Sequence, residues 1–562
     1  MDSGSQHKIL AEQVIERELE RCQNRAATVW HGVPKTAVME IVRSLDVAAF
    51  YRWVTGYDDS SDGDAARRAD LYAGIGAAAA LRPFLAKIKG MRGGVPLSRS
   101  TANSTRFTYA YLVCCGELSH LRRMAALERY GLASTQWTAP NQMHIEVRRG
   151  LPEQAALYAI RSLRPRASQR LVSQPTLEEK KELWDRMRGY VDTDPQTFIR
   201  YDNDLEIVSS YRADARAYGQ HYLEGEAFPS NVVLGDRTFG EWKNACDQAL
   251  GRILTHIDFA HLLTQKRSKK VALRDILTIP AKRDDAAAVW REAALSADLV
   301  DSTMVALTLT IDGLDDWEQS HEPPASFYVD FGRDFVLLSC FGALNNPYFA
   351  LFRHLRSVYR ADWDRGVDRR EAVFRDDLSK LFSEPRFLVP PNGFTLRRQD
   401  GSILTDIDAV VLDRDRGTLA LVQLKWHDPV GRSLTERESR RRNMSQANQW
   451  VERVSSWVDG RTSNQILRAL GLHENSADRP PLLYVIARYV ARFTDEIPPD
   501  PRAIWLGWPE ILQAKDTALT ANDPLIYLND VVTAHRARFN DLHDSHQTFH
   551  FPGLSVDLRV SS

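Results

Sequence analysis

The sequence predicts a mixed α/β (α+β) protein, in which a mostly helical N-terminal region is followed by a mixed sheet flanked by helices. Two observations carry this prediction. Apolar residues recur every three or four positions through residues 1–170, whereas residues 366–562 alternate short apolar strands with turn signals and amphipathic helices. The 562 residues, 43% of them hydrophobic and 26% charged, are enough for several domains with sizeable cores.

The overall charge and the cysteines narrow the class of protein. The formal net charge is -1, so a polyanion partner would have to be held by a local patch. The five cysteines form no C-x-x-C pair, which argues against a zinc module and a disulfide framework. The first 22 residues are polar where a signal peptide needs an apolar run, and no uninterrupted apolar stretch approaches 18 residues. We therefore expect a cytoplasmic protein without membrane contact.

The first 360 residues divide into a helical domain (1–170) and a mixed region (171–360), neither with obvious chemistry. Gly74, Gly76 and Ala79 have a loose dinucleotide-binding spacing, but they follow a helical pattern, which favours a helix–helix contact. Two later runs, "TMVALTLTIDGL" and "SFYVDFGRDFVLLSCFGAL", alternate like strands. The charged segment "RADWDRGVDRR" (360–370) is the predicted boundary before the C-terminal third.

The sequence of residues 366–562 predicts a series of helices and strands. The run "EAVFRDDLSKLF" predicts a helix with Glu371 beside its apolar face, and "FLVPPNGFTLRR" predicts a strand, a turn and a strand. The run "ILTDIDAVVLDRDRGTLALVQLKW" predicts a hairpin that turns at 413–417. Further on, "RPPLLYVIARYV" and "PRAIWLGW" read as strands, "PEILQAKDTAL" as a helix, and "HQTFHFPGLSVDLRV" as edge strands of the same sheet.

The hairpin gathers polar groups at one end of an apolar face. Because side chains alternate along a strand, a turn centred near 415–416 places Asp408 opposite Gln423 or one diagonal step away, with Lys425 near Asp406. Such groups are costly to bury without partners, and a hard cation such as Mg²⁺, or Mn²⁺, would supply one. For Asp406 a solvent-facing acid is favoured over a catalytic one. The alternative for Gln423 and Lys425 is an exposed edge-strand end.

This order of elements resembles the catalytic core of the PD-(D/E)xK nuclease superfamily, in the variant of Mrr-like restriction endonucleases that has glutamine at the second acidic position. The resemblance implies a restriction-endonuclease-like fold for residues 366–562 and a Mg²⁺-dependent nuclease. It implies a metal site formed by the side chains of Asp408 and Gln423 and the backbone of Leu424. The other matching positions are Lys425 as the motif lysine, Glu371 (or Asp376 or Asp377) as the acid of the first helix, and Gln446 with Trp450 on the following helix.

Two departures from the family pattern matter for the metal. No proline precedes Asp408, and Gln423 contributes no charge, so weak metal affinity is expected. The basic segment after the hairpin is the best sequence candidate for phosphate contact, although a solvated helix start explains it equally well. It contains Arg432, Arg437, Arg440, Arg441 and Arg442, and His427 precedes it either as a phosphate contact or as an exposed strand-end residue.

DNA is the expected substrate, and defence against foreign DNA or DNA repair is the setting that the family analogy suggests. RNA as the substrate, a degenerate module that binds without cleaving, and an activity carried by the first 360 residues remain as alternatives. A homo-oligomer is compatible with the sequence.

Overall fold

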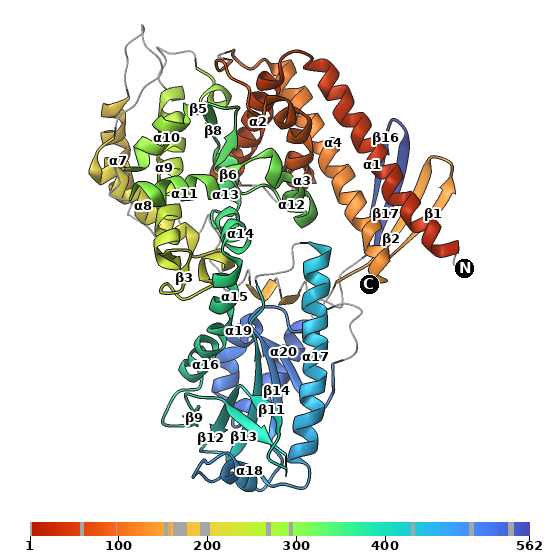
Figure 1. The fold of residues 1–562 in the computed structure, drawn as a ribbon, viewed down its shortest axis with the longest axis vertical. Coiled ribbons are helices and arrows are strands. Elements are labelled where there is room, and N and C mark those ends of the chain that lie inside the picture. The colour runs from red at the N-terminus through yellow and green to blue at the C-terminus, as the bar shows by residue number, and fades with distance from the viewer. Residues whose placement is uncertain are drawn as a thin grey trace.

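The computed structural model confirms a mixed α and β chain with a helical N-terminal region (Figure 1). A larger upper part contains the N-terminal helices, and a smaller lower part contains the sheet of the C-terminal third. The structure describes residues 3–56, 61–96, 98–150, 155–156, 158–160, 177–191, 203–265, 271–291, 296–398, 400–428, 433–493, 499–537 and 544–561.

Four long helices pack together at the N-terminus: α1 (Ser3–Val29), α2 (Pro34–Thr55), α3 (Ser61–Ile88) and α4 (Ala102–Ala126). On α3, Gly76 lies so close to the α4 backbone at Leu112 and Gly116 that a Cβ would clash with it. The glycine spacing is therefore a helix–helix contact, as predicted. Within the described residues α3 alone is long and apolar enough to cross a membrane, and most of its apolar window is buried against the rest of the protein.

A four-stranded sheet joins a hairpin that follows the N-terminal helices to the last two strands of the chain. Its order is β1 (Ala133–Ala139), β2 (Gln142–Arg148), β17 (Leu554–Ser561) and β16 (Ser545–Phe551), with β17 parallel to β2. The expectation that the last strands lie at the edge of the C-terminal sheet is wrong. Val556 and Leu558 are instead buried in the N-terminal core beside Met143 and Ile145 of β2, because these four residues present matching apolar faces on paired strands.

The middle region is mostly helical and carries a second four-stranded sheet, in the order β5-β8-β7-β6. Where "TMVALTLTIDGL" was expected to be a strand, helix α11 runs to Ala306 and only Thr308 and Leu309 are extended. The elements here are α7 (Leu177–Tyr190), α8 (Leu205–Gly219), β3 (Val233–Leu234), β4 (Arg237–Thr238), α9 (Phe239–Gln265), β5 (Ile279–Lys282), α10 (Arg283–Arg291), α11 (Ala297–Ala306), β6 (Thr308–Leu309), α12 (Leu314–Ser320), β7 (Tyr328–Asp330), β8 (Phe335–Leu338) and α13 (Cys340–Asn345).

Three short helices lead from the upper part into the lower part: α14 (Phe349–Val358), α15 (Arg360–Asp368) and α16 (Arg370–Leu381). The segment proposed as a boundary, 360–370, is thus helical. Its Trp363 is buried between Phe228 and Phe352, with ring centroids 4.7 and 4.6 Å away. This aromatic contact fixes the start of the C-terminal third to the middle region.

The C-terminal sheet has five strands in the order β15-β14-β13-β12-β9. The β9, β12 and β13 strands are antiparallel, whereas β14 and β15 run parallel to β13. The bounds are β9 (Phe387–Leu388), β10 (Phe394–Arg397), β11 (Ile403–Ile407), β12 (Ala409–Asp413), β13 (Thr418–Lys425), α17 (Leu434–Val458), α18 (Ser463–Ala469), β14 (Leu482–Ala487), β15 (Ile504–Gly507), α19 (Trp508–Leu519) and α20 (Pro524–Ala537).

Helices cover both faces of this sheet, which explains the near-continuous apolar runs of its strands. Val410 and Leu421 face α17, whereas Val411 and Val422 face α16, α19 and α20. The alternation predicted for the hairpin is therefore present. Asp408 and Gln423 fall on the α17 side by the same count.

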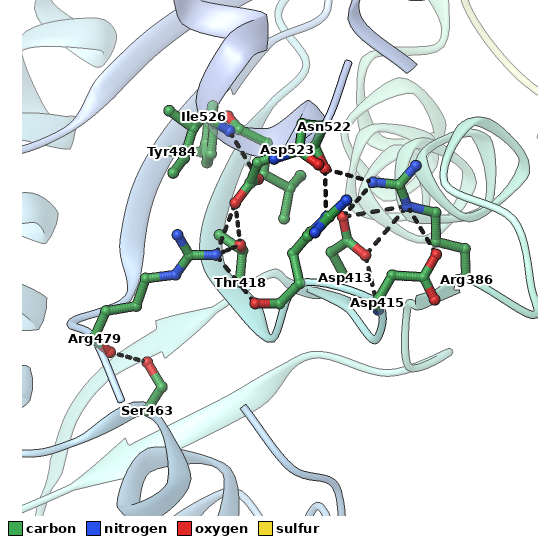
Figure 2. Close-up of polar contacts among 12 residues, drawn as sticks. Arg386, Asp413, Asp415, Thr418, Ser463, Arg479, Tyr484, Asn522, Asp523 and Ile526 are labelled. Atoms are coloured by element: carbon green, nitrogen blue, oxygen red, sulfur yellow. Dashed lines mark hydrogen bonds and ion pairs between the residues drawn. The ribbon is translucent and has the colours of Figure 1, made fainter. Parts of the chain in front are cut away.

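Polar contacts fix the turn end of the hairpin, as Figure 2 shows. Asp413, which has no exposed surface, pairs with Arg386 at 2.8 Å. Thr418 donates to the Asp523 carboxylate at 2.5 Å, and Arg479 pairs with the same carboxylate at 2.7 Å. Because Asp413 faces Thr418 in the ladder, these contacts set the register that puts Asp408 opposite Gln423.

Candidate active site

The site lies where the ladder between β12 and β13 opens. The pairing ends at Ala409 and Val422 because the preceding strand, β11, turns away to pair with β10. Strand β13 continues to Lys425 through its parallel pairing with β14. Asp408 stands at this change of partner. Its backbone N–H still donates to the Val422 carbonyl at 3.1 Å, while its carboxylate points across the gap.

Asp408 and Gln423 are in direct contact, as the register predicts. The Gln423 side-chain amide donates to the Asp408 carboxylate, and the Leu424 backbone N–H donates to the same oxygen at 2.7 Å. Both side chains are buried, with Asp408 only 5% exposed. Since β13 is a central strand and Gln423 is buried, the alternative of an exposed edge-strand end is excluded for Gln423.

Burial raises the pKa of Asp408 to about 6, and the negative charge of Glu371 adds to this rise. The hydrogen bond from Leu424, the charge of Lys425 and the hydrogen bond from Gln423 act in the opposite direction but do not cancel it. A bound cation would relieve the free-energy cost of this buried negative charge, and the second acid nearby adds to its attraction.

Glu371 is near Asp408 but is held by a residue that the sequence reasoning missed. Arg375 of α16 donates to the Glu371 carboxylate at 2.6 Å and to the Asp408 backbone carbonyl at 2.5 Å. The Glu371 side chain is 49% exposed, so it remains open to solvent on its other side. The i, i+4 spacing of Glu371 and Arg375 on one helix was the available signal. The other candidates for this acid, Asp376 and Asp377, pair with Lys380 and Arg488 respectively.

The backbone of Lys425 is held by Arg488, the residue that follows β14. The Arg488 backbone N–H donates to the Lys425 carbonyl at 2.7 Å, and the Arg488 guanidinium lies 4.4 Å from the centre of the Trp426 ring. Within the described residues we find no hydrogen bond or ion pair to the Lys425 ammonium group, although its charge acts on Asp408. Lys425 is half-buried and close to the Asp408 carboxylate. Its ammonium group forms no salt bridge to any residue that the structure describes.

Helix α17 packs against the site through Trp450, whose indole N–H donates to the Asp406 carbonyl at 2.7 Å. The Asp406 side chain itself is exposed, as favoured from the sequence. Gln446 is exposed one turn before Trp450, and no contact within the described part of the chain joins it to Asp408. The structure thus brings together Asp408, Gln423, Lys425 and Glu371, and leaves Gln446 at the surface.

The basic residues predicted to hold phosphate separate into two groups. Arg441 and Arg442 both pair with Glu438 on α17, and Arg442 is 74% exposed. Arg437 and Arg440 line a cavity together with His427. His427 is not an exposed strand-end residue: its Nε2 lies 3.3 Å from the Met444 sulfur, and burial lowers its pKa to about 4. Arg432 lies outside the described residues.

The residues present fit a single hard cation. Asp408 offers carboxylate oxygens, and the Gln423 amide can offer its oxygen after rotation of its terminal torsion. The Leu424 carbonyl points to the same side as its N–H, because both groups of a strand residue face one neighbour. No group of three or more His, Cys, Asp or Glu side chains lies at metal-binding distance in the residues described. The donor set is therefore one carboxylate with amide and carbonyl oxygens, which suits Mg²⁺ with retained waters.

Comparisons with protein-family models, with curated proteins and with solved structures find no match for this chain.

Proposed function

We propose that the C-terminal third is a metal-dependent nuclease that hydrolyses DNA phosphodiester bonds. The observation that carries the proposal is the buried Asp408 carboxylate, which faces Gln423 and Leu424 at the open end of a ladder beside the uncommitted Lys425. The order of elements supports it: a helix with an acid, antiparallel strands, a hairpin, a long helix and a strand parallel to β13. This is the order that the family resemblance implies.

Asp408, Gln423 and the Leu424 carbonyl would hold Mg²⁺ or Mn²⁺, which when bound supplies stabilisation for the negative charge that develops on the phosphate. Lys425 would orient the attacking water as the ammonium ion or, as the neutral amine, accept its proton. Glu371, fixed by Arg375, is placed to accept a hydrogen bond from a water at the exposed side of the site. Arg375 and Arg488 act as positioning residues, because they hold the backbones of Asp408 and Lys425.

We further propose that the first 360 residues regulate this centre, with defence against foreign DNA or DNA repair as the setting. The contact between the parts supports regulation: Arg356 of α14 pairs with Glu436 of α17 at 2.6 Å and lies 3.6 Å from Asp428, three residues after Lys425. A shift of the middle region would therefore reach both ends of the segment that follows Lys425.

The test is a cleavage assay with the full chain on plasmid, linear and single-stranded DNA and on matched RNA, in Mg²⁺, Mn²⁺ or EDTA. Asp408→Ala and Lys425→Ala are compared with Arg453→Gln, a control at an exposed position of α17. We expect metal-dependent DNA cleavage by the wild type and the control, and a loss of about 100-fold or more in both site variants. Preferential cleavage of RNA would identify an RNA-directed enzyme.

A degenerate module that binds nucleic acid without cutting it is the second candidate. It is favoured by one observation, the direct hydrogen bond from the Gln423 amide to Asp408, which satisfies the carboxylate without a metal. Binding of DNA without cleavage in any metal, equal in wild type and Lys425→Ala, would establish this candidate and refute the nuclease.

A further inference from the structure

A cavity of about 350 Å³ lies between the N-terminal region and the C-terminal third, and we call it the junction cavity. It is lined by α4, by the end of β2 and the residues after it, by β17, by the segment that follows β13, by the start of α17 and by the residues after β14. His427, two residues after Lys425, is one of the residues that line it. The cavity therefore exists only because distant parts of the chain meet there.

Five arginines line the junction cavity, against one acidic side chain, Asp428. The arginines are Arg123, Arg148, Arg149, Arg437 and Arg440. The charge of Asp428 is balanced mainly by two arginines that do not line the cavity: it pairs with Arg370 at 2.7 Å and lies 3.6 Å from Arg356. The lining thus holds more arginines than acidic side chains, although Glu322 acts on Arg123 and Glu436 on Arg440 from outside it.

The charges in the lining lie near one another. Burial lowers the pKa of Arg123, and the neighbouring Arg437 lowers it further against the opposing effect of Glu322. Burial is likewise the main cause of the lowered pKa of His427, which falls to about 4, so this imidazole is neutral at neutral pH and adds no charge. Arg123 and Arg437 are thus two like charges near each other, and such a pair favours a shared anionic ligand.

The rest of the lining is apolar. Met124, Leu127 and Leu132 come from the N-terminal region, and Leu434, Val490 and Phe493 from the C-terminal third. The Arg437 guanidinium lies 5.6 Å from the centre of the Phe493 ring. A ligand that matches both kinds of wall carries a negative charge at one end and a flat, weakly polar group at the other.

We propose that the junction cavity binds a nucleoside phosphate, with the phosphate on the arginines and the base against the apolar wall. The volume is near the lower end of the range for small-molecule sites, which favours one nucleotide over several. The same chemistry is offered by a free mononucleotide and by the 5′-phosphorylated terminal nucleotide of a strand. This site is distinct from the Asp408 centre, and binding to it does not require that centre to cleave DNA.

The test is calorimetric titration of the full chain in EDTA, so that cleavage does not interfere. The ligands are AMP, adenosine, inorganic phosphate, and one DNA decamer with either a 5′-phosphate or a 5′-hydroxyl. We expect AMP, or the 5′-phosphorylated decamer, to bind at least tenfold more tightly than adenosine, phosphate or the 5′-hydroxyl decamer. Arg437→Gln and Arg123→Gln should weaken this binding about tenfold or more, whereas Arg453→Gln should not.

If AMP binds and the 5′-phosphorylated decamer does not, the ligand is a free nucleotide. If the 5′-phosphorylated decamer binds more tightly than the 5′-hydroxyl decamer and AMP displaces it, the ligand is the end of a strand. Absence of binding by AMP and by the 5′-phosphorylated decamer at millimolar concentration would overturn the proposal. Equal binding of phosphate and AMP, or an equal loss in Arg453→Gln, would also overturn it, because both results indicate general attraction of anions. Arg123 and Arg437 are both half-buried, so either variant carries the test if the other fails to fold.

Discussion

Replacing Asp408 with asparagine is expected to stabilise the metal-free protein at neutral pH while removing the proposed metal ligand. Asp408 is buried, and its pKa is raised from 3.8 to about 6. The ionised carboxylate therefore costs free energy in the folded state that a neutral side chain of the same shape does not cost. The Asn amide oxygen keeps the bond from the Leu424 N–H, and a rotated Gln423 amide can present its oxygen to the new NH₂ group.

The magnitude follows from the shift. A rise of about two pKa units corresponds to about 3 kcal/mol at pH 7.5, where the carboxylate is ionised in both states. Between pH 4 and pH 6 the folded state holds a proton that the unfolded state has released, so wild-type stability falls as pH rises through this range. At pH 4 the advantage of the asparagine variant has shrunk to about 0.5 kcal/mol, and it disappears at lower pH, where both states are protonated.

The assay is amide hydrogen exchange of peptides from β12 and β13 at increasing urea concentration in EDTA, for both proteins at pH 4.5 and pH 7.5. This reports the local free energy of opening around the site and does not require two-state unfolding of the 562-residue chain. Mg²⁺ should then protect the wild type and leave Asp408→Asn unchanged. A variant that is less stable at pH 7.5, or a difference that does not change with pH, would refute this reasoning.

Three further substitutions test the packing. Asp413→Asn should lower the free energy of unfolding by about 2 kcal/mol in thermal unfolding, because Arg386 loses a buried ionic partner; an unchanged midpoint would mean that this pair does not fix the hairpin. Gly393→Ala should cost about 1–3 kcal/mol in urea unfolding and slow any cleavage, because its Cβ would lie 2.7 Å from a backbone oxygen of β11; full activity would contradict the close approach. Gly116→Ala should abolish soluble expression, since its Cβ would collide with the Tyr72 carbonyl of α3, and a normal yield would show that α3 and α4 can separate.

The local pattern was enough to predict the hairpin and the contact at its open end. Period-two alternation and the turn at 413–417 placed Asp408 opposite Gln423 or one diagonal step away, and the described ladder has the first of these registers. The same kind of reasoning placed the glycines of α3 at a helix–helix contact. These features depend on residues that are close in sequence or on side-chain size alone.

Features formed by distant segments were not accessible from the sequence. The pairing of β17 with β2 joins residues about 400 positions apart, and no alternation pattern tells a strand which sheet it will enter. The junction cavity has the same origin. One practical consequence is that a fragment beginning at residue 366 would keep β16 beside β17 but lose β2, which leaves one edge of β17 uncovered, so activity is best tested in the full chain.

The most direct test of the central claim is the rate of plasmid cleavage by wild type and Lys425→Ala in Mg²⁺. If Asp408, Gln423 and Lys425 form a metal-dependent hydrolytic centre, the wild type cleaves in Mg²⁺ and not in EDTA, and the variant is slower by about 100-fold or more while it keeps the wild-type melting temperature. Cleavage by Lys425→Ala at the wild-type rate, or wild-type cleavage that persists in EDTA, would contradict the claim.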